Sequence, residues 1–151
     1  MSRRIILGSA AALVVLGGGG AFALAHAGEQ PPALNKSTAR YTAPAVDHEG
    51  SFTFTTDVTA ASGVKSLKVL AWPADSPVLA KNPLTPKELA AVESATCKPT
   101  GDDTAVCTYK VTVTAAESAE SAKGRWHVAT LATADNGDTS FNDKTATFTV
   151  D

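Results

Sequence analysis

The sequence predicts a mainly β protein, an antiparallel β-sandwich of about seven strands with one or two short helices. Two observations favour this fold class. Several separate runs alternate between apolar and polar residues, which is the period of a half-buried strand. Turn residues recur between these runs at intervals typical of an all-β sandwich. A single sheet would leave its apolar face in water, so two sheets are expected to pack face to face.

Each run predicts one strand. The first contains Tyr41 and lies close to Pro44, which favours an edge position. The clearest is "SFTFTTDVT", in which Phe52 and Phe54 point to one side and the threonines between them to the other. The remaining strands are expected at residues 64–74, around Cys97, and at residues 105–114, 125–134 and 144–150.

Two helices are predicted from their starting signals. Thr85, Pro86 and Glu88 form the pattern of a capping box with proline in the first turn, which indicates a helix over residues 86–93. Thr114 and Glu117 repeat the capping pattern and predict one or two further turns, mostly in water.

Residues 1–27 have the pattern of a signal peptide. Arg3 and Arg4 precede an apolar run, and small residues fit cleavage before His26 or Gly28. Residues 28–38 then read as a flexible linker and residues 39–151 as the folded domain. We expect a secreted, extracellular protein. The alternative is a membrane-anchored cell-surface protein with an uncleaved leader.

The charge balance bears on the class of partner. Removal of Arg3 and Arg4 with the leader changes the net charge from −2 to −4. A nucleic-acid groove needs clustered basic residues, so we expect no nucleic-acid partner. We also expect no cofactor, a monomeric chain, and contact with a membrane only through an uncleaved leader.

The stretch "ATCKPTGDDTAVCTY" holds both cysteines, Cys97 and Cys107. Nine residues separate them, whereas a redox C-x-x-C pair has two, and no paired histidines complete a zinc site. Outside the cytosol nearby thiols are normally oxidised, and "KPTGDD" is a strong turn signal. We therefore favour a disulfide across a hairpin, with free thiols and a functional redox pair as alternatives.

Two polar clusters could carry chemistry. His48 lies between Asp47 and Glu49 and could act as a base in an extracellular hydrolase, but a solvated turn is the favoured interpretation. Asp135, Asn136 and Asp138 could bind calcium with Asp57 or with Asp102 and Asp103, yet a tight turn requires the same residues. We assign no catalytic residue and no metal site. His127 is expected to be exposed on its strand.

The remaining function is binding. Candidate partner-binding residues are Trp72, Pro77 and Pro83 around the proline-rich loop, and Tyr41 on the edge strand. Burial in the core is the favoured alternative for Trp72. We expect a non-catalytic binding or cell-envelope interaction module whose partner is an unknown protein or envelope component. The alternative is an extracellular hydrolase or inhibitor-like protein.

Several segments resemble known domains. "TFTTDVTAASGVKSLKVLAW" and "GRWHVATLATADNGDTSF" resemble hairpins of bacterial immunoglobulin-like modules. The order "ARYTAP", "GVKSLKVLAWP", "ESATC", "CTYKVTVT" and G-x-W resembles a family of small secreted bacterial domains of unknown function over residues 39–150. The resemblance implies an immunoglobulin-like sandwich, a signal peptide and the hairpin disulfide, and it gives no information about activity. The short cysteine spacing, and a tyrosine after Cys107 rather than before it, differ from antibody domains.

The leader pattern makes a direct prediction about the mature chain. We expect mass spectrometry of the protein from culture supernatant to find a chain that begins at His26 or Gly28. Recovery of the intact chain in the membrane fraction would instead establish an uncleaved anchor.

Overall fold

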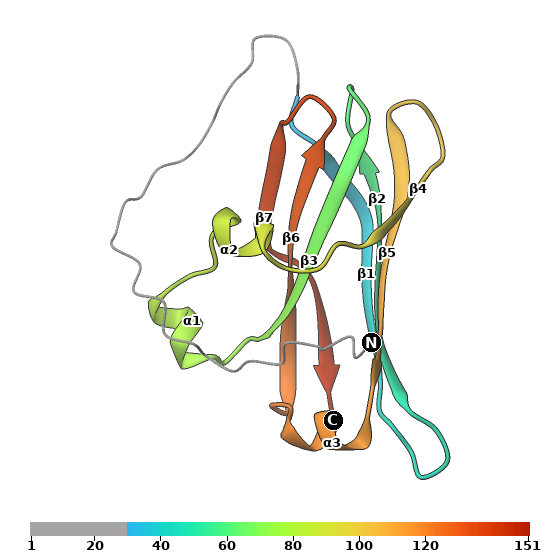
Figure 1. The fold of residues 1–151 in the computed structure, drawn as a ribbon. Coiled ribbons are helices and arrows are strands. Elements are labelled where there is room, and N and C mark those ends of the chain that lie inside the picture. Colours follow the sequence, from blue (N-terminus) through green and yellow to red (C-terminus); the bar gives the residue numbers. More distant parts are fainter. Residues whose placement is uncertain (1–29) are drawn as a thin grey trace.

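The computed structural model describes residues 30–151, so the predicted leader lies outside the described part. It contains seven strands and three short helices (Figure 1). The strands are β1 (Ala33–Thr42), β2 (Gly50–Thr59), β3 (Val64–Pro73), β4 (Thr96–Pro99), β5 (Thr104–Val113), β6 (Gly124–Ala134) and β7 (Thr139–Val150). The helices are α1 (Pro77–Lys81), α2 (Pro86–Ala90) and α3 (Ala115–Glu120). Within residues 30–151, no helix has the length and hydropathy to cross a bilayer.

The strands form two antiparallel sheets. One has the order β1-β2-β5-β4 and the other the order β3-β6-β7. These orders match the A-B-E-D and C-F-G sheets of a constant-type immunoglobulin domain when the strands are lettered in chain order. The predicted sandwich of seven strands is therefore confirmed, including its immunoglobulin-like arrangement.

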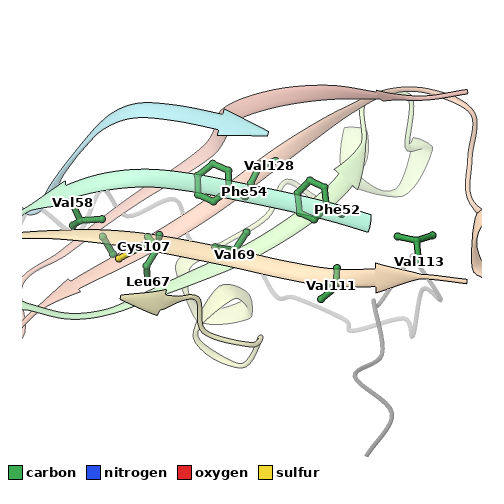
Figure 2. Close-up of a cluster of buried hydrophobic side chains, with 10 residues drawn as sticks. Phe52, Phe54, Val58, Leu67, Val69, Cys107, Val111, Val113 and Val128 are labelled. Carbon is green, nitrogen blue, oxygen red and sulfur yellow. The ribbon is translucent and has the colours of Figure 1, made fainter. Parts of the chain in front are cut away.

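The core lies between the two sheets and is built from alternate residues of each strand (Figure 2). Phe52 and Phe54 of β2 face Leu67 and Val69 of β3, and all four are buried. Trp126 is also buried, and its indole Nε1 donates a hydrogen bond to the Ala122 carbonyl at 2.8 Å. The alternation seen in the sequence therefore assigns the inner faces correctly.

The disulfide joins β4 to β5 within one sheet. Cys97 and Cys107 occupy directly opposite positions of the two strands, with Cα atoms 4.0 Å apart, and their sulfurs are bonded. The predicted hairpin disulfide is confirmed. Closing so short a loop contributes about 2–3 kcal/mol to stability in the loop-entropy treatment.

The first strand begins earlier than the sequence suggests. Residues 28–38 read as a linker, but β1 starts at Ala33 and pairs with β2. A bulge between Asn35 and Thr38 hides the alternation, because Lys36 has a positive φ of 53° and shifts the register. The strand is held there by the buried Thr56, whose hydroxyl bonds the Ser37 hydroxyl at 2.8 Å and the Asn35 carbonyl at 3.1 Å.

The helices cover the ends and one outer face of the sandwich. The expected capping boxes are present at Thr85 for α2 and Thr114 for α3. Helix α1 was not predicted, although Ser76 caps it and Pro77 follows, the same signal that identified α2. Figure 1 shows α1 and α2 beside the three-stranded sheet, on the side away from the other sheet. Helix α3 is mostly solvated, as expected, and Ser118 is its one buried residue.

The bulge interaction yields a stability prediction. Thr56→Val removes a hydroxyl that satisfies two groups of β1, and we expect a loss of about 1–3 kcal/mol in the free energy of unfolding. Thr55→Val makes the same change on the solvent side of β2 and is the matched control, with an expected change within about 0.5 kcal/mol. Urea unfolding monitored by tryptophan fluorescence measures both values. Equal stability of the two variants would show that the hydroxyl does not hold β1.

Candidate functional site

Trp72 lies on the outer face of the three-stranded sheet and is half-buried. It packs against a second, smaller apolar cluster that includes Leu89 of α2 and Leu131 of β6. Its indole Nε1 donates a hydrogen bond to the Asp143 carbonyl at 2.9 Å. Trp72 thus stabilises the contact between the sheet and the α2 segment, and only part of its ring is accessible to a partner.

The other predicted contact residues do not form one surface with Trp72. Pro77 and Pro83 are exposed on the connection that carries α1, beside the three-stranded sheet. Tyr41 belongs to the other sheet and points inward, where its ring stacks on Phe148 with centroids 6.3 Å apart. The Tyr41 hydroxyl bonds the Ser118 hydroxyl of α3 at 2.8 Å. Tyr41 is therefore half-buried and packed, which argues against its role as an exposed anchor.

His48 lies in an exposed turn between β1 and β2. Its Nδ1 atom is 3.8 Å from the Asp47 carboxylate, and the two side chains are 62% and 89% exposed. The hydrogen bonds of the described residues give His48 no serine or threonine partner. The favoured interpretation as a solvated polar turn fits this geometry.

The acidic turns meet at one end of the sandwich, as the calcium hypothesis required. The Ala60 amide donates to the Asp103 carbonyl at 2.7 Å, and the Asp135 amide donates to the Gly63 carbonyl at 3.0 Å. Gly63 has a φ of 102° and lies against the Asp135 carboxylate, where a side chain has no room. Backbone hydrogen bonds hold these turns together. Among residues 30–151, no three acidic, histidine or cysteine side chains come together as a metal-binding group.

His127 is more enclosed than expected. It is half-buried, its ring centroid is 4.8 Å from that of Trp72, and its Nδ1 atom is covered without a hydrogen-bond partner in the described structure. Burial lowers the pKa of His127 from its ordinary value of 6.5, and Lys144 and Arg125 lower it further, whereas Asp143 acts in the opposite direction. The folded state therefore favours the neutral form of the His127 imidazole.

The outer face of the four-stranded sheet carries a continuous row of threonines. Thr38 pairs with Thr55, Thr55 with Thr108, and Thr108 with Thr96, so the row crosses all four strands. Directly opposite residues in antiparallel strands project from the same face. Neighbouring strands are about 4.8 Å apart, so the row extends roughly 14 Å across the sheet. We call these four residues the threonine row.

Basic side chains border this row. Arg40 and Lys110 both pair with Thr53, on its two sides, and Lys98 lies on the opposite side of the row on β4. These three basic residues are exposed. The ion pairs found among residues 30–151 involve other side chains. A fourth basic residue, Lys36, has its amino group 3.7 Å from the Asp57 carboxylate on the same face.

A hollow of about 320 Å³ opens where the threonine row reaches β4. The chain crosses here from one sheet to the other, since the Ala95 amide donates to the Leu67 carbonyl at 2.8 Å just before β4 begins. Strand β4 pairs only with residues 105–108 of β5. Residues 109–113 of β5 therefore have no neighbouring strand on that side. We call this hollow the notch; it is lined by Glu93, Ser94, Thr96, Thr108, Tyr109, Lys110 and Val111.

Sequence reasoning did not identify this surface. The outward threonines of β2 were recognised as the solvent face of a strand, but their alignment with Thr38, Thr108 and Thr96 depends on the register between strands. A search for threonines at the polar positions of several predicted strands gives a usable signal. The order of the strands, which places the four residues side by side, comes from the fold.

The environment of His127 makes stability depend on pH. Because its pKa is lowered in the folded state, the unfolded chain binds the proton more readily as the pH falls below 6.5. The stability from the neutral imidazole is fully present above the unfolded pKa, is lost as the pH falls towards the folded pKa, and then levels off.

We expect His127→Gln to flatten this part of the profile of unfolding free energy against pH, measured by urea unfolding between about pH 5 and pH 7.5. The same replacement at His48, in its exposed turn, is the control. Parallel profiles for the His127 variant and the wild type would contradict the assignment.

Comparison with known proteins identifies the family to which the chain belongs. No curated protein sequence and no solved structure matches the chain. A family model described as "Family of unknown function (DUF5707)" matches residues 34–132, from the first strand into β6. The expected resemblance to a family of unknown function is confirmed, and the chain is a member of the DUF5707 family.

Proposed function

We propose that this protein is a non-catalytic, exported binding module that contacts its partner through the outer face of the four-stranded sheet. The threonine row is the observation that carries the proposal. Four hydroxyl groups at regular spacing on a rigid sheet offer a repeated set of hydrogen-bond donors and acceptors.

The two outer faces of the sandwich are not equally suited to bind a partner. The outer face of the three-stranded sheet packs Leu70, Trp72 and Phe141 against the buried Leu89 of α2, so part of it serves the fold itself. Figure 1 shows α1 and α2 on that side. The face with the threonine row lies on the other side of the sandwich, where a partner can approach the strands directly.

Rigidity also supports a binding role. The sheet is anchored by the disulfide at β4 and β5 and by the Thr56 hydroxyl at β1, near both of its edges. A face that keeps its spacing loses little conformational entropy when a ligand binds. The disulfide further supports an oxidising location outside the cytosol.

The proposal is tested by sedimentation of the purified protein with the cell-envelope fraction of the producing organism. Thr55→Trp places a large side chain in the middle of the threonine row, and we expect at least about ten-fold weaker binding. Thr149→Trp makes the same change at an exposed position of β7 in the other sheet and is the matched control.

The ligand is expected to be recovered chemically unchanged after incubation. Equal sedimentation of the two tryptophan variants and the wild type would place the binding surface elsewhere. Absence of wild-type sedimentation would contradict the proposed function itself.

A further inference from the structure

We infer that the outer face of the four-stranded sheet binds an anionic glycan, a polymer whose repeating units carry hydroxyl groups together with carboxylates or phosphodiesters. This inference rests on the proposed function and names its ligand. It follows from three features of this one face: its positive charge, its hydroxyl groups and the absence of outward aromatic side chains from its strands.

This face is positively charged, whereas the described part of the chain has a net negative charge. Residues 30–151 contain 11 basic and 14 acidic residues. The outward positions of β1, β2, β4 and β5 nevertheless carry Lys36, Arg40, Lys98 and Lys110 against a single acid, Asp57. The acidic remainder repels an anionic polymer, and the field of the protein therefore directs such a polymer to this face.

The positions of the cations suit an extended ligand. Arg40 and Lys110 lie on either side of Thr53, two strand spacings or roughly 10 Å apart. Lys98 is on the far side of the threonine row from them. A chain that crosses the face therefore meets positive charge on both sides of a band of hydroxyl groups.

The chemistry of the face favours a glycan over other polyanions. Insertion into an anionic membrane needs apolar or aromatic side chains, and binding of single-stranded nucleic acid uses aromatic side chains for base stacking. Phe52 and Phe54 are buried between the sheets, and Tyr41 and Tyr109 are partly buried against the same core. Tyr109 also reaches the notch at the edge of the sheet, so the outward positions of the four strands themselves carry no aromatic side chain. The outward positions carry mostly threonine and basic residues, which suit sugar hydroxyls and anionic groups.

The notch provides a place for one unit of the polymer. Its volume lies at the lower end of the range of small-molecule sites. Thr96, Thr108 and Lys110 belong to both the notch and the outer face, so the two are continuous. Glu93 also lines the notch, with a carboxylate oxygen 3.3 Å from the Tyr109 hydroxyl. This carboxylate favours a hydroxyl-bearing part of the ligand there, with the anionic groups over Arg40 and Lys110.

The experiment compares defined polymers by calorimetry at about 50 mM and about 200 mM salt. Polygalacturonate supplies carboxylates, poly(glycerol phosphate) supplies phosphodiesters, and dextran is the neutral control. Vesicles that contain phosphatidylglycerol and single-stranded DNA represent the other polyanions. We expect one or both anionic glycans to bind, with an affinity that falls as salt rises, and dextran to bind at least about ten-fold more weakly.

Charge variants locate the site. Arg40→Gln combined with Lys110→Gln is expected to weaken glycan binding about ten-fold and to reduce its dependence on salt. Lys65→Gln combined with Lys87→Gln removes the same charge from exposed positions outside this sheet and is the matched control. All four side chains are exposed, so both double variants are expected to unfold at the wild-type temperature.

Three results would overturn the inference: dextran bound as tightly as the anionic glycans, equal binding by the two double variants, or tighter binding of vesicles or DNA than of either glycan. The envelope sedimentation experiment distinguishes a wrong ligand from a wrong binding surface. If Thr55→Trp abolishes envelope sedimentation while neither anionic glycan binds, the binding surface stands and only its ligand is wrong. If Thr55→Trp leaves sedimentation unchanged, the surface itself is wrong.

Discussion

The two sheets are held together by burial of one face of each against the other. Phe52, Phe54 and Val58 from one sheet meet Leu67 and Val128 from the other in a continuous apolar layer (Figure 2). Because strand side chains alternate between the two faces, filling this layer also decides which residues face water. A shift of one residue in β2 would exchange Phe54 with Thr55, which would lose the core and the threonine row together.

The connection between β3 and β4 shapes the candidate site. It first lies along the outer face of the three-stranded sheet, where Leu89 belongs to the same apolar cluster as Trp72, and then crosses to the other sheet through Ala95. The disulfide fixes β4 on β5 immediately after this crossing. The notch is therefore a consequence of where the chain changes sheets, since β4 pairs with only part of β5.

Much of the fold could be predicted from the sequence because its signals are local. Alternation identified the strands and their inner faces, and the residues Thr85 and Thr114 marked two helix starts. Two local signals were missed. The bulge at Lys36 interrupts the alternation of β1, and Ser76 and Pro77 carry the start of α1 inside a loop that seemed irregular. The environment of His127 could not be predicted, because its ring contact comes from Trp72 of another strand and part of its pKa shift comes from charges on β7.

The sequence by itself determined the strands, their buried faces and the hairpin disulfide, because each depends on residues close together in the chain. The tertiary structure alone decided which side chains share a surface. It separated Tyr41 from Trp72, which lie in different sheets, and it aligned threonines and basic residues from four strands on one face. The physical reason is that pairing between distant strands sets the register, and register follows from packing of the whole core rather than from any single segment.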